Sequence, residues 1–157
     1  GAKILYQTIG NKFVVTYDSV RFWNGNAPNP SGGAVCSAFD YLNFMQMLLN
    51  KGIFNNKRIL SEKAVQEMLT IQFPDLKVRY TPELAKDFKY ALGAWVQERD
   101  DAEKGFVFSC PGLLGTWPWM DTKRNYLGIV FSKGLITGQK KELSIQVKEA
   151  VDTALDQ

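Results

Sequence analysis

The sequence lacks some of the residues that most often carry out catalysis at neutral pH. Histidine is absent from all 157 residues, which removes the commonest general base and the commonest zinc ligand. Ser-His-Asp and Cys-His arrangements therefore cannot be assembled from these residues alone. No serine is followed by lysine three positions later, so a lysine-activated Ser-x-x-Lys nucleophile is also missing. We predict no catalytic residue within the chain.

The two cysteines, Cys36 and Cys110, are the strongest nucleophiles that remain. Without a histidine base, a cysteine more often acts as a small apolar group than as a nucleophile. The count permits one disulfide, but no local pattern favours pairing. The sequence has no Cys-x-x-Cys pair, no phosphate loop and no dinucleotide fingerprint, and its scattered carboxylates favour no ion. We expect neither a cofactor nor a metal.

A cluster of carboxylates is the other feature with chemical potential. Paired carboxylates can perform general acid–base catalysis, but a charge cluster between two strands is more typical of a solvated turn. We interpret the cluster as a turn. Its members are Glu98, Asp100, Asp101 and Glu103.

The composition predicts a globular protein that has no strongly charged surface. Hydrophobic residues make up 45% and charged residues 22% of the chain, and the formal net charge is +3. The basic residues are scattered, which argues against a nucleic-acid partner. No apolar run approaches the roughly 18 residues of a membrane span, so none is predicted.

Two helices begin with capping signals. Ser37 precedes apolar residues at helical spacing, Asp40 completes a capping pair with it, and Gly52 supplies a stop. Met45 and Met47 are expected in or near the core of this helix. Ser61 repeats the capping signal for a second helix. Its buried stripe is expected to contain Ala64, Val65, Met68 and Leu69.

A third helix is expected at the C-terminal end, packed through one apolar face. That face consists of Leu143, Val147, Ala150, Val151, Ala154 and Leu155.

The remaining pattern predicts antiparallel strands. Alternation over Ile4–Tyr17 around a Gly-Asn pair indicates a hairpin, and Asn24–Gly33 has the composition of a loop. Pro74–Lys89 is interpreted as a surface excursion. Three short apolar runs indicate strands buried on both faces: Tyr90–Val96, Gly105–Cys110 and Tyr126–Phe131. The order of hairpin, two helices, antiparallel strands and helix predicts an α+β fold, an antiparallel sheet flanked by helices.

Two blocks of sequence carry a family resemblance. The first runs from the double glycine Gly32-Gly33 through Ser37, Asp40 and Gly52 to the Leu60-Ser61 pair. The second comprises Tyr90–Trp95, Ser109–Thr116 and Trp119–Asp121. In order and spacing these blocks resemble the C-terminal half of the serine beta-lactamase and penicillin-binding-protein-like hydrolases, the DD-peptidase fold. In that family the second block is a Y-x-L-G-W strand, then a strand that ends in a Lys/His, Ser/Thr, Gly triplet, then a glycine turn and a strand ending in Asp.

The resemblance assigns a substrate-binding role to the end of the triplet strand. Leu113 would offer a backbone N–H to the oxyanion of an acyl-transfer intermediate, and Gly112 would let the substrate approach closely. Cys110 and Pro111 depart from the family, since they replace a cation and a hydroxyl, which makes beta-lactam recognition doubtful. Trp117 completes the expected substrate-binding set.

The tryptophans flanking Pro118 have two interpretations of equal weight. Trp117 and Trp119 would either line a substrate cleft or fill the core. Trp23, with Phe22, would form the opposite wall of such a cleft.

The resemblance also implies that the reacting groups lie elsewhere. Residues 1–157 would form a single domain, the C-terminal portion of a serine hydrolase that cleaves amides or esters through an acyl-serine and is inactive alone. The Tyr41-Leu42-Asn43 sequence matches the family's Tyr-x-Asn motif but falls within a helix, so it is interpreted as coincidence. Two alternatives remain open: a non-catalytic ligand-binding or regulatory module of the same fold, and an unrelated α/β binding domain.

Further expectations concern partners and location. The missing N-terminal half, or a second copy in a homodimer, would cover an apolar sheet edge or face. The substrate would be a small molecule or a peptide. A periplasmic or secreted location follows from the family alone.

Overall fold

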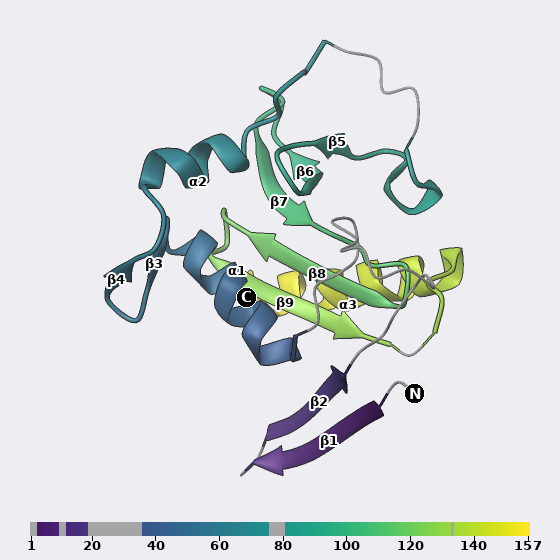
Figure 1. Ribbon diagram of the computed structural model, residues 1–157. Coiled ribbons are helices and arrows are strands. Elements are labelled where there is room, and N and C mark those ends of the chain that lie inside the picture. The colour runs from purple at the N-terminus through teal and green to yellow at the C-terminus, as the bar shows by residue number, and fades with distance from the viewer. Residues whose placement is uncertain (1–2, 10–11, 19–35, 76–80, 133) are drawn as a thin grey trace, which may run out of the picture. The chain divides into compact units, whose positions relative to one another are not determined.

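The structure is a computed structural model that describes residues 3–9, 12–18, 36–75, 81–132 and 134–157 (Figure 1). The chain divides into two compact units, Gly1–Phe44 and Met45–Gln157, and each is treated by itself. The single domain expected over residues 1–157 stays a prediction.

The first unit contains the expected hairpin. Strand β1 (Lys3–Ile9) pairs antiparallel with β2 (Lys12–Asp18), with Ile9 opposite Lys12. The expected Asn24–Gly33 loop and the aromatic pair Phe22 and Trp23 lie outside the described residues.

The capping prediction for the first helix is confirmed. Helix α1 (Ala38–Leu49) begins after Ser37, whose Oγ accepts a hydrogen bond from Asp40 N at 3.1 Å. The Asp40 carboxylate in return accepts from Ser37 N and Oγ at 3.2 and 2.7 Å. Met45 and Met47 are buried, as expected. Beyond the helix, Gly52 N donates to Met47 O at 2.8 Å and ends it.

A short hairpin that the sequence reading missed follows α1. Strands β3 (Ile53–Phe54) and β4 (Lys57–Arg58) are joined by Asn55 and Asn56, which have φ values of 48° and 60°. Two successive positive φ angles are typical of the two-residue turns that connect antiparallel strands, and asparagine tolerates them well.

Helix α2 (Glu62–Met68) begins at the expected cap. Ser61 Oγ accepts a hydrogen bond from Ala64 N at 3.1 Å, and Val65 is buried. The chain beyond α2 differs from the expected surface excursion. A 3₁₀ turn, η1 (Glu83–Ala85), buries Ala85, and Phe88 packs against the core. The prediction for Pro74–Lys89 is therefore wrong for its second half, because apolar residues there cover the sheet.

Five antiparallel strands form the central sheet in sequence order (Figure 1). They are β5 (Lys89–Tyr90), β6 (Trp95–Arg99), β7 (Gly105–Ser109), β8 (Thr116–Asp121) and β9 (Tyr126–Phe131).

The expected single strand Tyr90–Val96 is in fact two strands and a reversal. Tyr90 pairs with Trp95 across the turn, and Ala91 N donates to Ala94 O at 2.9 Å. Gly93 has a φ of +84°, a conformation that glycine adopts at little cost. The chain therefore turns where its apolar composition suggested a continuous strand.

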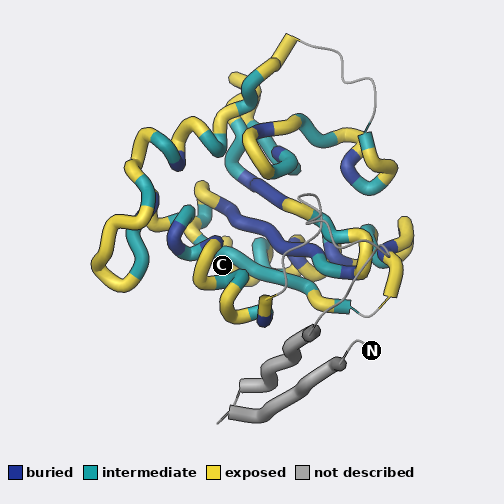
Figure 2. The backbone as a smooth tube through the Cα atoms, viewed as in Figure 1, coloured by how far each residue is buried: buried dark blue, intermediate teal, exposed yellow. Residues whose placement is uncertain are grey.

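The core lies against β7 and β8, which carry the longest buried stretches of the sheet (Figure 2). Val107, Trp117, Trp119 and Ile136 form its centre, and Ile145 of α3 (Gly138–Leu155) packs against them. Helix α3 therefore covers one face of the sheet (Figure 1). Strand β9 is only partly buried along its length, so its expected burial on both faces is not observed.

The orientation of α3 contradicts the expected apolar face. Leu143 and Leu155 are 58% and 54% exposed, whereas Ser144 and Lys148 are buried at 3% and 1% exposure. The helix turns a polar face toward the sheet because Lys148 pairs there with carboxylates.

Candidate functional site

The candidate site is the connection between β7 and β8. The ladder between these strands reaches Ser109 opposite Trp119 and resumes at a single bridge, Gly112 opposite Thr116. Between these contacts each side carries a proline, Pro111 or Pro118, which has no N–H to donate. The interruption of the ladder therefore has a local cause in the sequence.

The end of the connection is a tight turn over residues 112–115. Gly112 N donates to Thr116 O at 2.8 Å, and Gly115 N donates to Gly112 O at 3.0 Å. Ser132 fixes the turn from β9's side, since its N and Oγ both donate to Gly115 O, at 2.7 and 3.0 Å. Ile136 N donates to Leu113 O at 2.9 Å. The turn is thus held to the segment before α3.

The packing requires only one of the two glycines of this turn. Gly115 has a φ of +99°, and a Cβ there would lie 2.2 Å from Ser132 O. The fold therefore requires glycine at that position. A Cβ at Gly112 would meet nothing closer than Thr116 Cβ at 3.4 Å, an ordinary contact. The described packing does not require glycine at Gly112, so a role in admitting a ligand is open to it.

The backbone N–H of Leu113 is the group in this connection that is best placed to donate a hydrogen bond to a ligand. Leu113 is 58% exposed, so the residue lies at the surface and not in the interior. No hydrogen bond between described residues uses its backbone N–H, whereas that of Gly112 is bound to Thr116. Leu113 is therefore the position where a ligand oxygen would find an amide donor.

The neighbouring predicted site residues take different positions. Cys110 is exposed and Pro111 is half-buried beside the turn. Trp117 is completely buried in the core cluster, and Trp119 is 3% exposed. The burial of both tryptophans favours the core interpretation over a lining of a cleft. Residues 110–113 therefore lie at or near the protein surface. Trp117, in contrast, is buried in the core.

Cys36 and Cys110 are exposed thiols, and no disulfide occurs in the part of the chain that the structure describes. Burial and, to a smaller extent, the Asp40 carboxylate raise the pKa of the Cys36 thiol. Cys36 is therefore not activated as a thiolate. Tyr41, Leu42 and Asn43 lie within α1, as expected.

A buried ionic cluster joins α3 to the sheet, and the sequence reading missed it. Lys148 Nζ lies 2.6 Å from Glu98 Oε1 on β6 and 2.6 Å from Asp152 Oδ2. Tyr126 on β9 donates a short hydrogen bond to Asp152. The only sequence signal was the four-residue spacing of Lys148 and Asp152.

Arg124 extends the cluster at the β8–β9 turn. Its guanidinium contacts Asp121 and Asp156 at 3.2 and 2.8 Å. Asp121 is fully buried, and its Oδ1 also accepts from Lys123 N and Arg124 N, each at 2.8 Å. The arrangement satisfies each buried charge, which is the condition for ionic groups to be tolerated in the interior.

The contacts between Lys148 and Asp152 favour the charged form of both groups. Burial alone would lower the pKa of Lys148, but hydrogen bonds to Asp152 and Glu98 outweigh it and raise the pKa. Burial would raise the pKa of Asp152, but its bonds with Lys148 and Tyr126 lower it below the ordinary value. Lys148 and Asp152 are therefore both ionised at neutral pH, as a structural link needs, and neither is poised for proton transfer.

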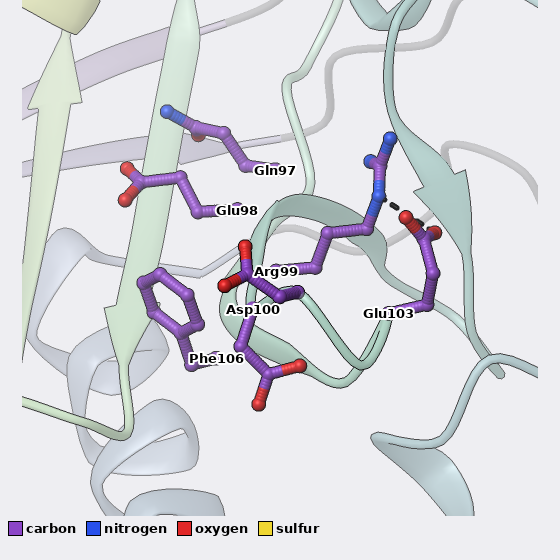
Figure 3. Close-up of a pocket in the computed structure, with 7 residues that line it drawn as sticks. Gln97, Glu98, Arg99, Asp100, Glu103 and Phe106 are labelled. Atoms are coloured by element: carbon purple, nitrogen blue, oxygen red, sulfur yellow. Dashed lines mark ion pairs between the residues drawn. The ribbon is translucent and has the colours of Figure 1, made fainter.

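The acidic cluster of the β6–β7 turn lines an open depression of about 590 Å³ (Figure 3). Two of the carboxylates of this turn have partners: Glu103 pairs with Arg99 at 2.8 Å, and Asp100 accepts from Ala102 N and Lys104 N. Asp100, Asp101 and Glu103 are exposed, as expected for a solvated turn. Glu98 differs, because it belongs to β6 and pairs with Lys148.

The described residues show neither a metal-binding cluster nor a membrane-spanning helix. They contain no group of three or more Cys, Asp or Glu side chains placed to hold a metal ion. None of the described helices combines the length and apolar character needed to cross a membrane.

One solved structure has a fold similar to that of this chain. A crystal structure from Bacteroides dorei, described as a "putative beta-lactamase", matches 78% of this chain with a TM-score of 0.63 and 25% sequence identity. The chain therefore has a mixed helical and antiparallel fold related to the beta-lactamase fold. It spans 39% of that neighbour.

Sequence comparison adds two curated relatives, both from Mycobacterium tuberculosis. They are the uncharacterized protein MT1414 of strain CDC 1551 / Oshkosh and protein Rv1367c of strain H37Rv. Each is 34% identical over 94 residues, which covers 58% of this chain and 23% of the relative. The chain thus spans about a quarter of the curated relatives it matches. No protein-family model matches the chain.

Proposed function

We propose that this chain supplies the oxyanion-side strand of a beta-lactamase-related serine hydrolase. The single observation that supports this most is that Leu113, an exposed residue beside Gly112 after β7, has a backbone N–H that no hydrogen bond between described residues uses, in a beta-lactamase-like fold. In this proposal the chain is the C-terminal portion of the catalytic domain. The nucleophile and its base belong to an N-terminal half.

The reaction proposed is acyl transfer to serine. The serine Oγ forms a bond to the carbonyl carbon of an amide or ester, its proton passes to the base, and negative charge collects on the carbonyl oxygen. Leu113 N–H donates to that oxygen, and stabilisation of this kind is usually the largest single contribution to such catalysis. The leaving group departs with a proton, and water then releases the acyl group.

The residues around the proposed donor indicate the kind of substrate. Cys110 and Pro111 provide neither a positive charge nor a hydroxyl where the resembling family has both. A substrate carboxylate would gain little from them. We therefore favour a neutral ester or amide of a small molecule or peptide over a beta-lactam. A periplasmic or secreted location would suit the proposed family.

The same two residues support a second candidate, a ligand-binding or regulatory module without catalysis. In that case the fold would retain the Gly112–Leu113 edge but would bind a carbonyl ligand without cleaving it. The sequence that precedes the chain in its gene separates the two candidates, because only the hydrolase needs a Ser-x-x-Lys.

The test removes one hydrogen atom from the proposed site. Leu113 is the second residue of the 112–115 turn, a position where proline is favoured, so Leu113→Pro deletes the N–H with little disturbance of the turn. In the complete protein we expect kcat for a short-chain ester to fall by roughly 10²–10³-fold, the cost of one oxyanion donor.

Leu113→Ala is the matched control, because it removes the side chain and keeps the N–H. We expect kcat within a few-fold of the unchanged protein. Equal activity of the proline and alanine variants would contradict the proposed donor. Binding of an ester analogue without turnover by the unchanged complete protein would favour the non-catalytic module instead.

A further inference from the structure

Ser132 joins the candidate turn to the end of β9. Phe131, the last residue of β9, pairs with Thr116 at the start of β8, so the next residue, Ser132, lies opposite Gly115. Ser132 N donates to Gly115 O at 2.7 Å and continues the strand pairing by one step. Ser132 Oγ donates to the same oxygen at 3.0 Å. The Gly115 carbonyl therefore uses both of its lone pairs on one residue.

The pairing between β7 and β8 gives the turn little support of its own. The ladder between these strands is interrupted before the Gly112–Thr116 bridge, and Pro111 has no N–H with which to continue it. Gly115 has a φ of +99°, and glycine has more conformational freedom to lose than any other residue. Contacts that reach the turn from outside these two strands therefore matter for its rigidity.

Two carbonyl groups of the turn receive such contacts. Leu113 O accepts from the backbone N–H of Ile136 at 2.9 Å, and Ile136 belongs to the buried core cluster. Gly115 O accepts from Ser132. Among these hydrogen bonds, that of the Ser132 hydroxyl is the one made by a side chain. A single substitution can therefore remove it and keep the backbone hydrogen bonds of the turn.

The direction of the Leu113 N–H decides whether it can stabilise an oxyanion. Such a donor must lie roughly 2.7–3.1 Å from the position that the oxyanion occupies. Catalytic groups have to be held within about 0.5 Å and about 10–20° of the productive geometry. In a loose turn the N–H would point in the productive direction for only part of the time.

We propose that Ser132 is a positioning residue for the Leu113 donor. Its hydroxyl holds the Gly115 carbonyl, and through it the turn that carries Leu113, and it does not contact the substrate. This inference rests on the oxyanion role proposed above for Leu113. Because the oxyanion forms only in the transition state, loss of the hydroxyl lowers kcat and leaves KM nearly unchanged.

Kinetics of the complete protein provide the first test. Ser132→Ala removes the hydroxyl and keeps the backbone N–H of residue 132. We expect kcat for a short-chain ester to fall by roughly tenfold, the rate equivalent of one hydrogen bond. Ser132→Thr restores a hydroxyl and is expected to return kcat to within a few-fold of the unchanged protein. Unchanged kcat in Ser132→Ala, in a protein that Leu113→Pro inactivates, would overturn the role of Ser132 and leave the proposed function standing.

Thr122 provides a matched control at the other end of β7. Its N and Oγ both donate to Phe106 O, at 2.9 and 3.1 Å, the same arrangement that Ser132 makes with Gly115. Thr122→Ala removes the equivalent hydroxyl far along the strand from the turn, and kcat is expected to stay close to that of the unchanged protein. Equal losses of kcat in Thr122→Ala and Ser132→Ala would indicate a general structural effect and would overturn the proposal.

Nuclear magnetic relaxation tests the positioning without relying on catalysis. With nitrogen-15-labelled leucine, the order parameter of the Leu113 N–H is expected near about 0.85 in the unchanged protein, the value of rigid backbone. We expect it to fall toward about 0.6 in Ser132→Ala and to stay high in Ser132→Thr and Thr122→Ala. Equal order parameters in all four proteins would refute the proposal. A lower value in Ser132→Ala, together with no ester hydrolysis by the unchanged protein, would support the hold of Ser132 on Leu113 and contradict the proposed function.

Discussion

The role proposed for Gly112 and Leu113 depends on the backbone, so residue types alone give little indication of it. A backbone N–H belongs to every residue except proline, so composition and spacing cannot single out the one at Leu113. Only the resemblance of the Ser109–Thr116 segment pointed to it. The turn around it was easier to predict, because Gly115 occupies a conformation that other residues rarely adopt.

Lys148 is the residue whose role differs most from its sequence context. It lies among apolar helix positions, yet it is 1% exposed and pairs with two carboxylates. The sequence could not reveal this, since Glu98 is distant along the chain and only the folded sheet brings it to the helix. Buried lysines are unusual unless they are paired, so the pairing decides how α3 packs.

Replacing Lys148 should destabilise the chain strongly. Lys148→Met keeps most of the side-chain volume but leaves Asp152 and Glu98 without their cation. We expect the free energy of unfolding to fall by about 3 kcal/mol, the lower end of the range for breaking a buried pair, because Glu98 keeps contact with water. Urea unfolding followed by circular dichroism measures it.

The control is an exposed ion pair treated in the same way. Lys51 lies 3.0 Å from Glu62, with both side chains more than half exposed. Lys51→Met should change the free energy of unfolding by no more than about 1 kcal/mol. Similar losses in the free energy of unfolding for the two variants would show that the Lys148 cluster does not stabilise the packing of α3 on the sheet.

The starts of the helices could be predicted from local sequence signals, whereas the side of α3 that faces the sheet could not. The capping pair Ser37 and Asp40 and the cap Ser61 act within three residues, so the starts of α1 and α2 could be predicted. The β3–β4 hairpin was not predicted because its strands have only two residues each, too few to show a periodic pattern. The helical period of α3 was clear, but which side faces the sheet depends on partners elsewhere in the chain.

Strand β8 illustrates how neighbouring strands accommodate large side chains. Trp119 lies directly opposite Gly128 on β9, and a Cβ at Gly128 would come within 2.3 Å of the indole. The glycine therefore provides the space that the tryptophan fills. Tyr126 packs edge-on against the same indole, with ring centres 6.4 Å apart.

Gly128→Ala should therefore cost stability although alanine is usually better tolerated than glycine in folded elements. The added methyl group must displace the buried Trp119, and overpacking of this kind costs roughly 1–3 kcal/mol. The matched control is Gly138→Ala at the start of α3, where a Cβ would meet nothing within 4 Å. It should leave stability unchanged or raise it by up to about 1 kcal/mol. Thermal unfolding of the two variants checks the contrast, and a Gly128→Ala chain as stable as the control would contradict this account of β8.

The chain corresponds to only part of each protein that it resembles. The chain covers 39% of its beta-lactamase-like structural neighbour and 23% of its curated relatives. It contains a five-stranded sheet and a buried core, but neither histidine nor Ser-x-x-Lys. A pocket wall can be positioned without a nucleophile, so the proposed hydrolase and the isolated chain need not share an activity.

The isolated chain is accordingly expected to be catalytically inactive. An oxyanion donor accelerates the attack of a nucleophile but cannot replace one, since the bond to the carbonyl carbon must still form. Incubation with a chromogenic beta-lactam and with a short-chain nitrophenyl ester should give hydrolysis rates equal to those in buffer alone, at concentrations where circular dichroism shows a folded chain.

Ser132, whose hydroxyl donates a hydrogen bond to Gly115 O of the candidate turn, is the serine to replace in a test of this expectation. Turnover of either substrate that disappeared in Ser132→Ala, while the fold was retained, would place a nucleophile inside these residues and overturn the assignment of the reacting groups to another part of the protein.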